Sequence, residues 1–290
     1  MWNTKLCLGT SRKSFRMPLE EQIRLFKRVG FDAFFTDWQP GDDVAALRRV
    51  AEEIGIEYQS IHAPSGRTKS IWQSGQEGEA ATDELIACLR ICKKNHIPLM
   101  VAHAYCGFDV AETENERPTE IGLLRFVRLI DEAERLGVRI AFENAEGEEF
   151  FTTLMEAFCD RSCVGLCWDT GHELCYNHGR DILARYGGRL FGTHLNDNLG
   201  IRDFNGHITW LDDLHLLPFD GITDWHDIAD RLNEHAYGGI LTFEVSKTNK
   251  PGRHENDIYE KMSDEEYVTE AYKRACRVAT LRNRRRGDTK

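Results

Sequence analysis

The sequence contains no long apolar run. Its longest hydrophobic stretches have the length of a β-strand, far short of the roughly 20 apolar residues that a membrane-spanning helix needs. Its first residues, MWNTKLCLGTSRKSF, also lack the apolar block of a secretory signal peptide. These absences argue against a membrane protein and against an exported one, so we expect a cytoplasmic location and no membrane partner.

Paired cysteines are also lacking. The chain has nine cysteines, an odd number, and no two of them have the CxxC spacing that is typical of zinc and redox sites. We interpret them as reduced, mostly buried thiols, which agrees with a reducing compartment.

Basic charge is in deficit. Lysine and arginine number 37 against 48 aspartates and glutamates, which gives a net charge of −11. Because nucleic-acid binding depends on basic side chains that neutralise phosphates, this balance argues against a nucleic-acid partner, although a local patch can override a net charge. The only dense basic run is the final RNRRRGDTK, which we interpret as a solvated, frayed end.

Eight short apolar runs alternate with longer amphipathic ones. The apolar runs are KLCLGT, AFFTDW, EYQSIHA, PLMVAHA, VRIAFEN, VGLCWDT, LFGTHLN and GILTFEV. Such near-continuous apolar strands are typical of a parallel sheet that is covered on both faces. The helical runs between them carry stop signals such as Gly30, Gly55 and Gly137. The pattern predicts an α/β fold, a (β/α)8 TIM barrel, with residues 1–290 as a single domain. The longest loop is predicted from Asp197 to Asp220.

Six successive predicted strands end in a titratable side chain. These are His62, His103, Glu143, Asp169, His194 and Glu244. A single histidine could belong to a core, and a single aspartate could cap a helix, but strand ends meet at one mouth of a TIM barrel. This mixed oxygen and nitrogen set, without thiolates, suits Mn²⁺, Co²⁺, Mg²⁺ or Zn²⁺. A divalent ion there would polarise a carbonyl, and two carboxylates from separate strands could move a proton beside it.

The motifs FEN, WDTGH, THLND and FEV, with DLHLLPFDGITDW before the last, resemble the xylose-isomerase-like barrel proteins. Within them, they are similar to the sugar phosphate isomerase/epimerase group of ketose 3-epimerases and inosose isomerases. The resemblance extends over essentially the whole chain. It implies one divalent metal ion with four ligands: Glu143, Asp169, His194 and Glu244. It also implies that Glu143 and Glu244 exchange the substrate proton, and that His172 contacts a substrate oxygen.

Further substrate contacts are expected from five residues: His62, His103, Glu149, Arg202 and His215. The spacing around Glu149 and Arg202 departs from the epimerase pattern. The expected activity is a metal-dependent isomerisation or epimerisation of a sugar, a sugar phosphate or an inosose, by proton transfer next to a carbonyl through an enediolate. The expected partner is a small-molecule sugar or polyol-derived substrate, and homo-oligomerisation is left open.

Two alternatives stay open. The same superfamily contains the three-zinc apurinic-site endonucleases, and their nine ligands have counterparts here: His62, His103, Glu143, Asp169, His172, His194, Asp213, His215 and Glu244. The other alternative is a barrel without catalytic activity.

Six basic residues lie in loops on the predicted active face, where they could hold a phosphate or be ordinary solvated charges: Lys13, Arg67, Lys69, Arg202, Lys247 and Arg253.

Overall fold

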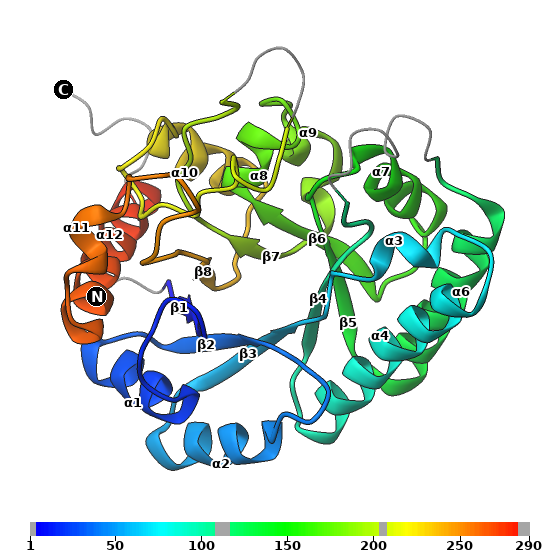
Figure 1. The fold of residues 1–290 in the computed structure, drawn as a ribbon, viewed down its shortest axis with the longest axis horizontal. Coiled ribbons are helices and arrows are strands. Elements are labelled where there is room, and N and C mark those ends of the chain that lie inside the picture. The colour runs from blue at the N-terminus through cyan, green and yellow to red at the C-terminus, as the bar shows by residue number, and fades with distance from the viewer. Residues whose placement is uncertain (1–3, 108–116, 203–207, 284–290) are drawn as a thin grey trace.

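Eight parallel strands form one sheet in the computed structural model, which describes residues 4–107, 117–202 and 208–283 (Figure 1). The strands are β1 (Leu6–Gly9), β2 (Ala33–Asp37), β3 (Glu57–His62), β4 (Leu99–His103), β5 (Arg139–Glu143), β6 (Val164–Asp169), β7 (Leu190–His194) and β8 (Leu241–Phe243). Their order is β7-β6-β5-β4-β3-β2-β1-β8. The outer strands β7 and β8 meet at a parallel bridge between Leu195 and Phe243. The predicted TIM barrel is therefore confirmed.

Helices surround the barrel (Figure 1). The longer ones are α1 (Leu19–Val29), α2 (Val44–Ile54), α4 (Gln76–Lys94), α6 (Glu120–Leu136), α7 (Glu148–Ala157), α10 (Trp225–Glu234) and α12 (Asp264–Asn283). The short ones are α3 (Thr68–Ile71), α8 (Thr170–Cys175), α9 (Ile182–Tyr186) and α11 (Asp257–Glu260), with a 3-10 turn at Gly187–Arg189. In the described ranges, no helix combines the length and the apolar character that crossing a bilayer requires.

The predicted helix ends at glycine are confirmed. Gly55 and Gly137 follow α2 and α6 with φ angles of 65° and 66°, a left-handed conformation that glycine adopts without steric cost. Helices α3, α8 and α11 were not expected, because runs of six residues or fewer carry too little periodicity to read.

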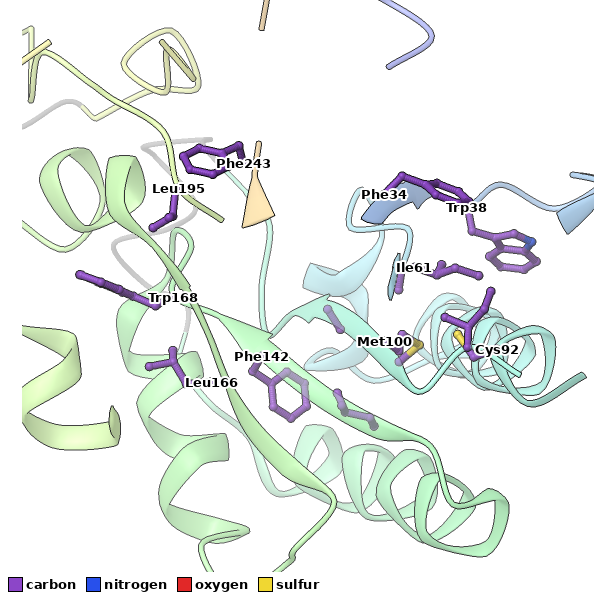
Figure 2. Close-up of a cluster of buried hydrophobic side chains, with 14 of the residues drawn as sticks. Phe34, Trp38, Ile61, Cys92, Met100, Phe142, Leu166, Trp168, Leu195 and Phe243 are labelled. Carbon is purple, nitrogen blue, oxygen red and sulfur yellow. The ribbon is translucent and has the colours of Figure 1, made fainter. Parts of the chain in front are cut away.

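Side chains alternate along the strands between two apolar regions. Outward-facing residues pack against the helices in the main hydrophobic cluster, part of which Figure 2 shows: Phe34, Met100, Phe142, Leu166 and Trp168. Inward-facing residues fill the barrel in smaller clusters, one of them formed by Leu99, Val101, Ala141 and Cys167. Burial of each large side chain contributes about 1.5–3 kcal/mol. All nine cysteines are free and six of them are buried, as expected.

Asp197 organises the long loop between β7 and α10. Its carboxylate is fully buried and accepts hydrogen bonds from the backbone N–H groups of Asn198, Phe219 and Thr223, and from Trp225 Nε1. The four donors lie 2.9–3.0 Å away. Asp197, which ends the THLND motif, therefore joins the start of the loop to its last residues and to the start of α10.

A buried ion pair links the loop after β8 to the start of α12. Lys247 Nζ lies 2.8 Å from Asp264 Oδ1, and both side chains are nearly inaccessible. The other oxygen of Asp264 accepts the backbone N–H of Arg16 at 2.9 Å. Burial acts to raise the pKa of Asp264, but Lys247 and the backbone donors outweigh it and lower the pKa below its usual value.

We expect Asp264→Asn to lower the free energy of unfolding by about 3–5 kcal/mol at pH 7, because it leaves Lys247 buried without its partner. The folded-state pKa is lowered, so the contribution is present above the unfolded pKa of about 3.9 and is lost as the pH falls through the folded pKa. In urea denaturation, the difference in unfolding free energy between wild type and Asp264→Asn should become smaller as the pH is lowered.

The matched control is Asp160→Asn, which alters an exposed carboxylate and should change stability by less than about 0.5 kcal/mol. A deficit of Asp264→Asn that stayed constant down to strongly acidic pH would contradict the assignment.

Candidate metal-binding and catalytic site

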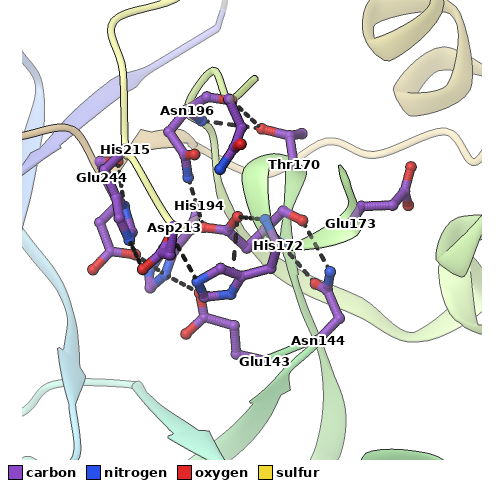
Figure 3. Close-up of polar contacts among 12 residues, drawn as sticks. Glu143, Asn144, Thr170, His172, Glu173, His194, Asn196, Asp213, His215 and Glu244 are labelled. Atoms are coloured by element: carbon purple, nitrogen blue, oxygen red, sulfur yellow. Dashed lines mark hydrogen bonds and ion pairs between the residues drawn. The ribbon is translucent and has the colours of Figure 1, made fainter. Parts of the chain in front are cut away.

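The inward-facing positions at the carboxyl ends of the strands converge on one polar site (Figure 3). Strands β2 to β7 end in Asp37, His62, His103, Glu143, Asp169 and His194, and Glu244 directly follows β8. The structure thus brings the six predicted strand-end residues together. It adds Asp37, which sequence analysis did not select although it ends a strand in the same way.

Glu143 lies at the centre of the site and is fully buried. Its Oε2 is 3.1 Å from His62 Nε2 and 3.2 Å from His103 Nε2, and its Oε1 is 2.9 Å from His194 Nδ1. Burial acts to raise the pKa of Glu143, but the surrounding imidazoles outweigh it and hold the pKa well below its usual value. Glu143 is therefore ionised, and its carboxylate contacts histidines from three other strands.

His194 lies between two carboxylates. Its Nδ1 is 2.9 Å from both Glu143 Oε1 and Glu244 Oε2. The ring of Phe35 stacks on it, with a centroid distance of 4.8 Å and an interplanar angle of 16°. Cys167 is close by, but burial raises the pKa of its thiol to about 12. The thiol is therefore neutral, and the charged donors are oxygens.

Asp169 both belongs to the site and caps a helix. Its Oδ1 accepts the backbone N–H of His172 at 2.6 Å, which starts α8, and its Oδ2 accepts Asn196 Nδ2 at 2.7 Å. The side-chain amide of Asn144 holds the backbone of Asp169: its Oδ1 accepts the N–H of Asp169 at 2.7 Å, and its Nδ2 donates to the carbonyl of Asp169 at 2.9 Å. Burial raises the pKa of Asp169 to about 6, with Glu143 adding to the shift. A nearby cation would favour its ionised form.

His172, Asp213 and His215 form a second arm of the site. His215 Nε2 is 2.9 Å from Asp213 Oδ2, and His172 Nε2 is 3.4 Å from Asp213 Oδ1. Lys250 Nζ lies 3.6 Å from Asp213 Oδ2. Since His172 Nδ1 is 3.6 Å from Glu143 Oε1, this arm continues directly from the first cluster.

Two histidines are oriented by carbonyl groups. His62 Nδ1 lies 2.8 Å from the carbonyl of Ala63, and His215 Nδ1 lies 3.0 Å from that of Glu244. A carbonyl partner makes Nδ1 the donor, so Nε2 faces the carboxylates. This is the usual arrangement of a metal-binding or substrate-binding imidazole.

Two predicted contacts are not brought into this cluster. Glu149 lies on α7, which begins at Glu148, so its side chain points outward, half exposed, and bonds Arg117. Glu146, which precedes α7, is instead the buried carboxylate near the site, with its Oε2 4.0 Å from His103 Nδ1. The side chain of Arg202 is exposed, and only its backbone N–H is held, by Asp212 at 3.0 Å. These two expectations are corrected accordingly.

Sequence analysis also missed Asn144, Asn196 and Lys250. The signal for the asparagines was their position, since Asn144 follows Glu143 and Asn196 comes two residues after His194. Lys250 carried no comparable signal because it follows no strand directly.

The donor set fits a divalent cation. One ligand atom from each of Glu143, Asp169, His194 and Glu244 can be chosen so that all lie within 4.8 Å of one another. The same holds for two further groups: His62, His103 and Glu143; and His172, Asp213 and His215. His172 Nδ1 and Asp213 Oδ1 are buried without a hydrogen-bond partner. Crowded buried carboxylates and unpartnered donor atoms are costly without a ligand, so the site could hold a metal ion.

The chain is similar to several known proteins. The family described as xylose isomerase-like TIM barrel matches residues 23–267. The uncharacterised protein y4fM of Sinorhizobium fredii is 25% identical over 275 residues, which cover 81% of this chain and 84% of that protein.

Solved structures share the fold. The structure of the IOLI protein with a bound zinc atom has a TM-score of 0.73 and 20% identity, covering 95% of this chain and 98% of that one. D-psicose 3-epimerase from Clostridium cellulolyticum H10, solved with D-tagatose, has a TM-score of 0.67 and 16% identity, with the same two coverages.

Gly171 provides a test of how Asp169 is held. A Cβ at Gly171 would lie 2.0 Å from Asn196 Oδ1, and Asn196 donates to Asp169. We expect Gly171→Ala to displace Asn196 and to lower the unfolding free energy by about 1–3 kcal/mol, as overpacking of a filled interior does. Gly188→Ala is the control, because a Cβ there meets no atom within 4 Å. Equal denaturation midpoints for the two variants would contradict this packing.

Proposed function

Because this chain belongs to the xylose isomerase-like TIM barrel family, we propose that it is a metal-dependent isomerase or epimerase of a sugar, a sugar phosphate or an inosose. One observation carries the proposal. Two carboxylates from separate strands, Glu143 and Glu244, lie at equal distances of 2.9 Å from His194 Nδ1. This placement supports a role for both carboxylates in proton transfer at one metal-binding centre.

The proposed metal ligands are Glu143, Asp169, His194 and Glu244. A divalent cation bound there supplies a Lewis acid, which stabilises negative charge beside a substrate carbonyl. The mixed oxygen and nitrogen donors suit Mn²⁺, Co²⁺, Zn²⁺ or Mg²⁺. The similar IOLI structure contains a zinc atom, which supports binding of a divalent cation by this fold.

The side chains of the chain perform the proton transfer. One of Glu143 and Glu244 removes the proton from the carbon next to the carbonyl, and the other returns a proton. Return to the same carbon from the opposite face inverts the stereocentre. Return to the adjacent carbon, with transfer of the hydroxyl proton to the former carbonyl oxygen, converts an aldose into a ketose or the reverse. Both routes pass through an enediolate.

The remaining histidines position the substrate. Asp213 holds His172 and His215 with their rings toward the site, so that they can bond substrate hydroxyl groups. His62 and His103 hold Glu143 from the other side. Since Glu143 is fully buried, its proton exchanges with the substrate in surroundings that exclude most water, which strengthens electrostatic effects.

We expect metal-loaded protein to contain about one divalent ion per chain by elemental analysis. Asp169→Asn or Glu244→Gln should weaken binding beyond the roughly 10–100-fold typical of losing an outer partner. Glu149→Gln is the matched control, because that carboxylate lies on the outside of α7, and it should leave the affinity unchanged. A metal content in Asp169→Asn equal to that of wild type would contradict the assignment of Asp169 as a ligand.

The apurinic-site endonuclease stays a second candidate, because its nine counterparts fall into three groups that could each hold an ion. The net charge of −11 opposes it. So does Lys250, whose ammonium lies 3.6 Å from Asp213 and supplies positive charge where a further cation would bind. Three tightly held zinc ions, with metal-dependent nicking of duplex DNA at an abasic site, would establish this candidate instead.

The proton transfer can be followed by deuterium uptake. Metal-loaded protein is incubated in D₂O with ketoses, aldoses, their phosphates and inosose-type ketones, and the products are analysed by NMR. We expect deuterium next to the carbonyl of at least one compound. Glu143→Gln and Glu244→Gln should each slow uptake by about 10²–10⁴-fold, the usual contribution of general acid–base catalysis. Uptake that persisted in the double variant would refute these residues as acid and base.

A further inference from the structure

A cavity of about 450 Å³ opens beside the site, over the ends of β1 and β8. It reaches Glu244, His215 and Asp37 on the side of the site. Strand β1 ends in Gly9, where a Cβ would lie 2.6 Å from the ring of Phe35. Because Gly9 has no side chain, the ring of Phe35 packs over the end of β1 and forms part of the cavity wall. The volume of the cavity suits a ligand of sugar size.

The far wall of the cavity has a different chemistry. It is lined by two lysines and four hydroxyl-bearing residues from the loops after β1 and β8: Lys13, Lys250, Ser11, Ser14, Ser246 and Thr248. Two of the hydroxyls, on Ser14 and Ser246, lie 3.2 Å apart and so hold the two loops together.

The structure distinguishes between the basic residues of the active face. Arg67 pairs with Glu77 at 2.6 Å and Lys247 with Asp264 at 2.8 Å, and neither residue lines this cavity. Arg253 pairs with Glu255 at 2.7 Å.

Lys13 and Lys250 are placed differently. Lys13 lines the cavity and has no ion pair within the part of the chain that the structure describes. Lys250 also lines it, with Nζ 5.3 Å from the ring centre of Trp210 and 3.6 Å from Asp213 Oδ2. Both lysines therefore line one cavity that also includes Glu244.

The two lysines of the cavity are possible partners for an anion. Two lysines oppose Asp37 and Glu244 on its walls. Glu244 is a proposed metal ligand, so its charge is compensated there, and Asp213 is occupied by His172 and His215. An uncharged sugar would need hydroxyl and amide partners only, whereas paired ammonium groups beside several hydroxyls are the usual surroundings of a phosphate or a carboxylate.

We propose that Lys13 and Lys250, with the hydroxyls between them, bind an anionic end group of the substrate, a phosphate monoester or a carboxylate, while its carbonyl end lies at Glu143 and Glu244. This inference rests on the proposed function and narrows its substrate class to acidic sugars. The reacting carbons and the anionic group then lie in two connected parts of one cavity.

The test uses the metal-loaded full chain and two probes, inorganic phosphate and acetate, in calorimetric titrations at low salt. We expect binding of at least one anion, with affinity reduced by about 10-fold or more in Lys13→Gln/Lys250→Gln, because charge-assisted bonds are lost. Lys250→Arg keeps the charge and should retain most of the affinity. Lys93→Gln/Lys94→Gln removes the same charge from exposed positions at the end of α4 and should bind as wild type does. The tighter of the two probes identifies the end group.

The variant Asp169→Asn distinguishes anion binding by the lysines from anion binding by the metal. It should lose the cation but keep anion binding, since the lysines are unaffected. Anion binding that is unchanged in Lys13→Gln/Lys250→Gln, that disappears only in Asp169→Asn, or that is absent from wild type for both probes would overturn the inference. Failure of the proposed function would appear elsewhere, as deuterium uptake that survives loss of Glu143 and Glu244.

Discussion

A fully buried carboxylate is the constraint on which the site depends. Glu143 is removed from water in the mouth of the barrel, and an isolated charge there would be strongly unfavourable. Three imidazoles compensate it, and each comes from a different strand. The register of β3, β4 and β7 against β5 is therefore coupled to the ionisation of one side chain. A strand that shifted by one residue would turn its histidine outward and leave Glu143 uncompensated.

The barrel and its strand-end residues could be predicted because their signals are local. A parallel strand covered on both faces is a short apolar run, and a polar residue at its end stands out against it. His62 to Glu244 were identified in this way, and their convergence follows from the geometry of a barrel alone. Asp37 obeys the same rule, so the sequence contained its signal as well.

The remaining site residues depend on how loops fold, which spacing does not determine. Glu149 was expected in the site, but α7 begins at Glu148 and turns it outward. Glu146, still in the loop before that helix, points inward instead. The D-x-H pair Asp213 and His215 was visible in the sequence, yet its contact with His172 depends on how the loop after β7 folds. Lys250 reaches the site from yet another loop, the one that follows β8.

The bonds of Asp197 have a consequence for how the molecule opens. A long loop without helix or strand ordinarily exchanges its amide hydrogens with solvent quickly, because little opposes its local unfolding. Here the amides of Phe219 and Thr223 donate to the buried carboxylate of Asp197, which lies shortly after the end of β7. Releasing them would leave a buried negative charge without donors. We therefore expect the described part of the loop after residue 207, which carries Asp213 and His215, to open together with the strands and not on its own.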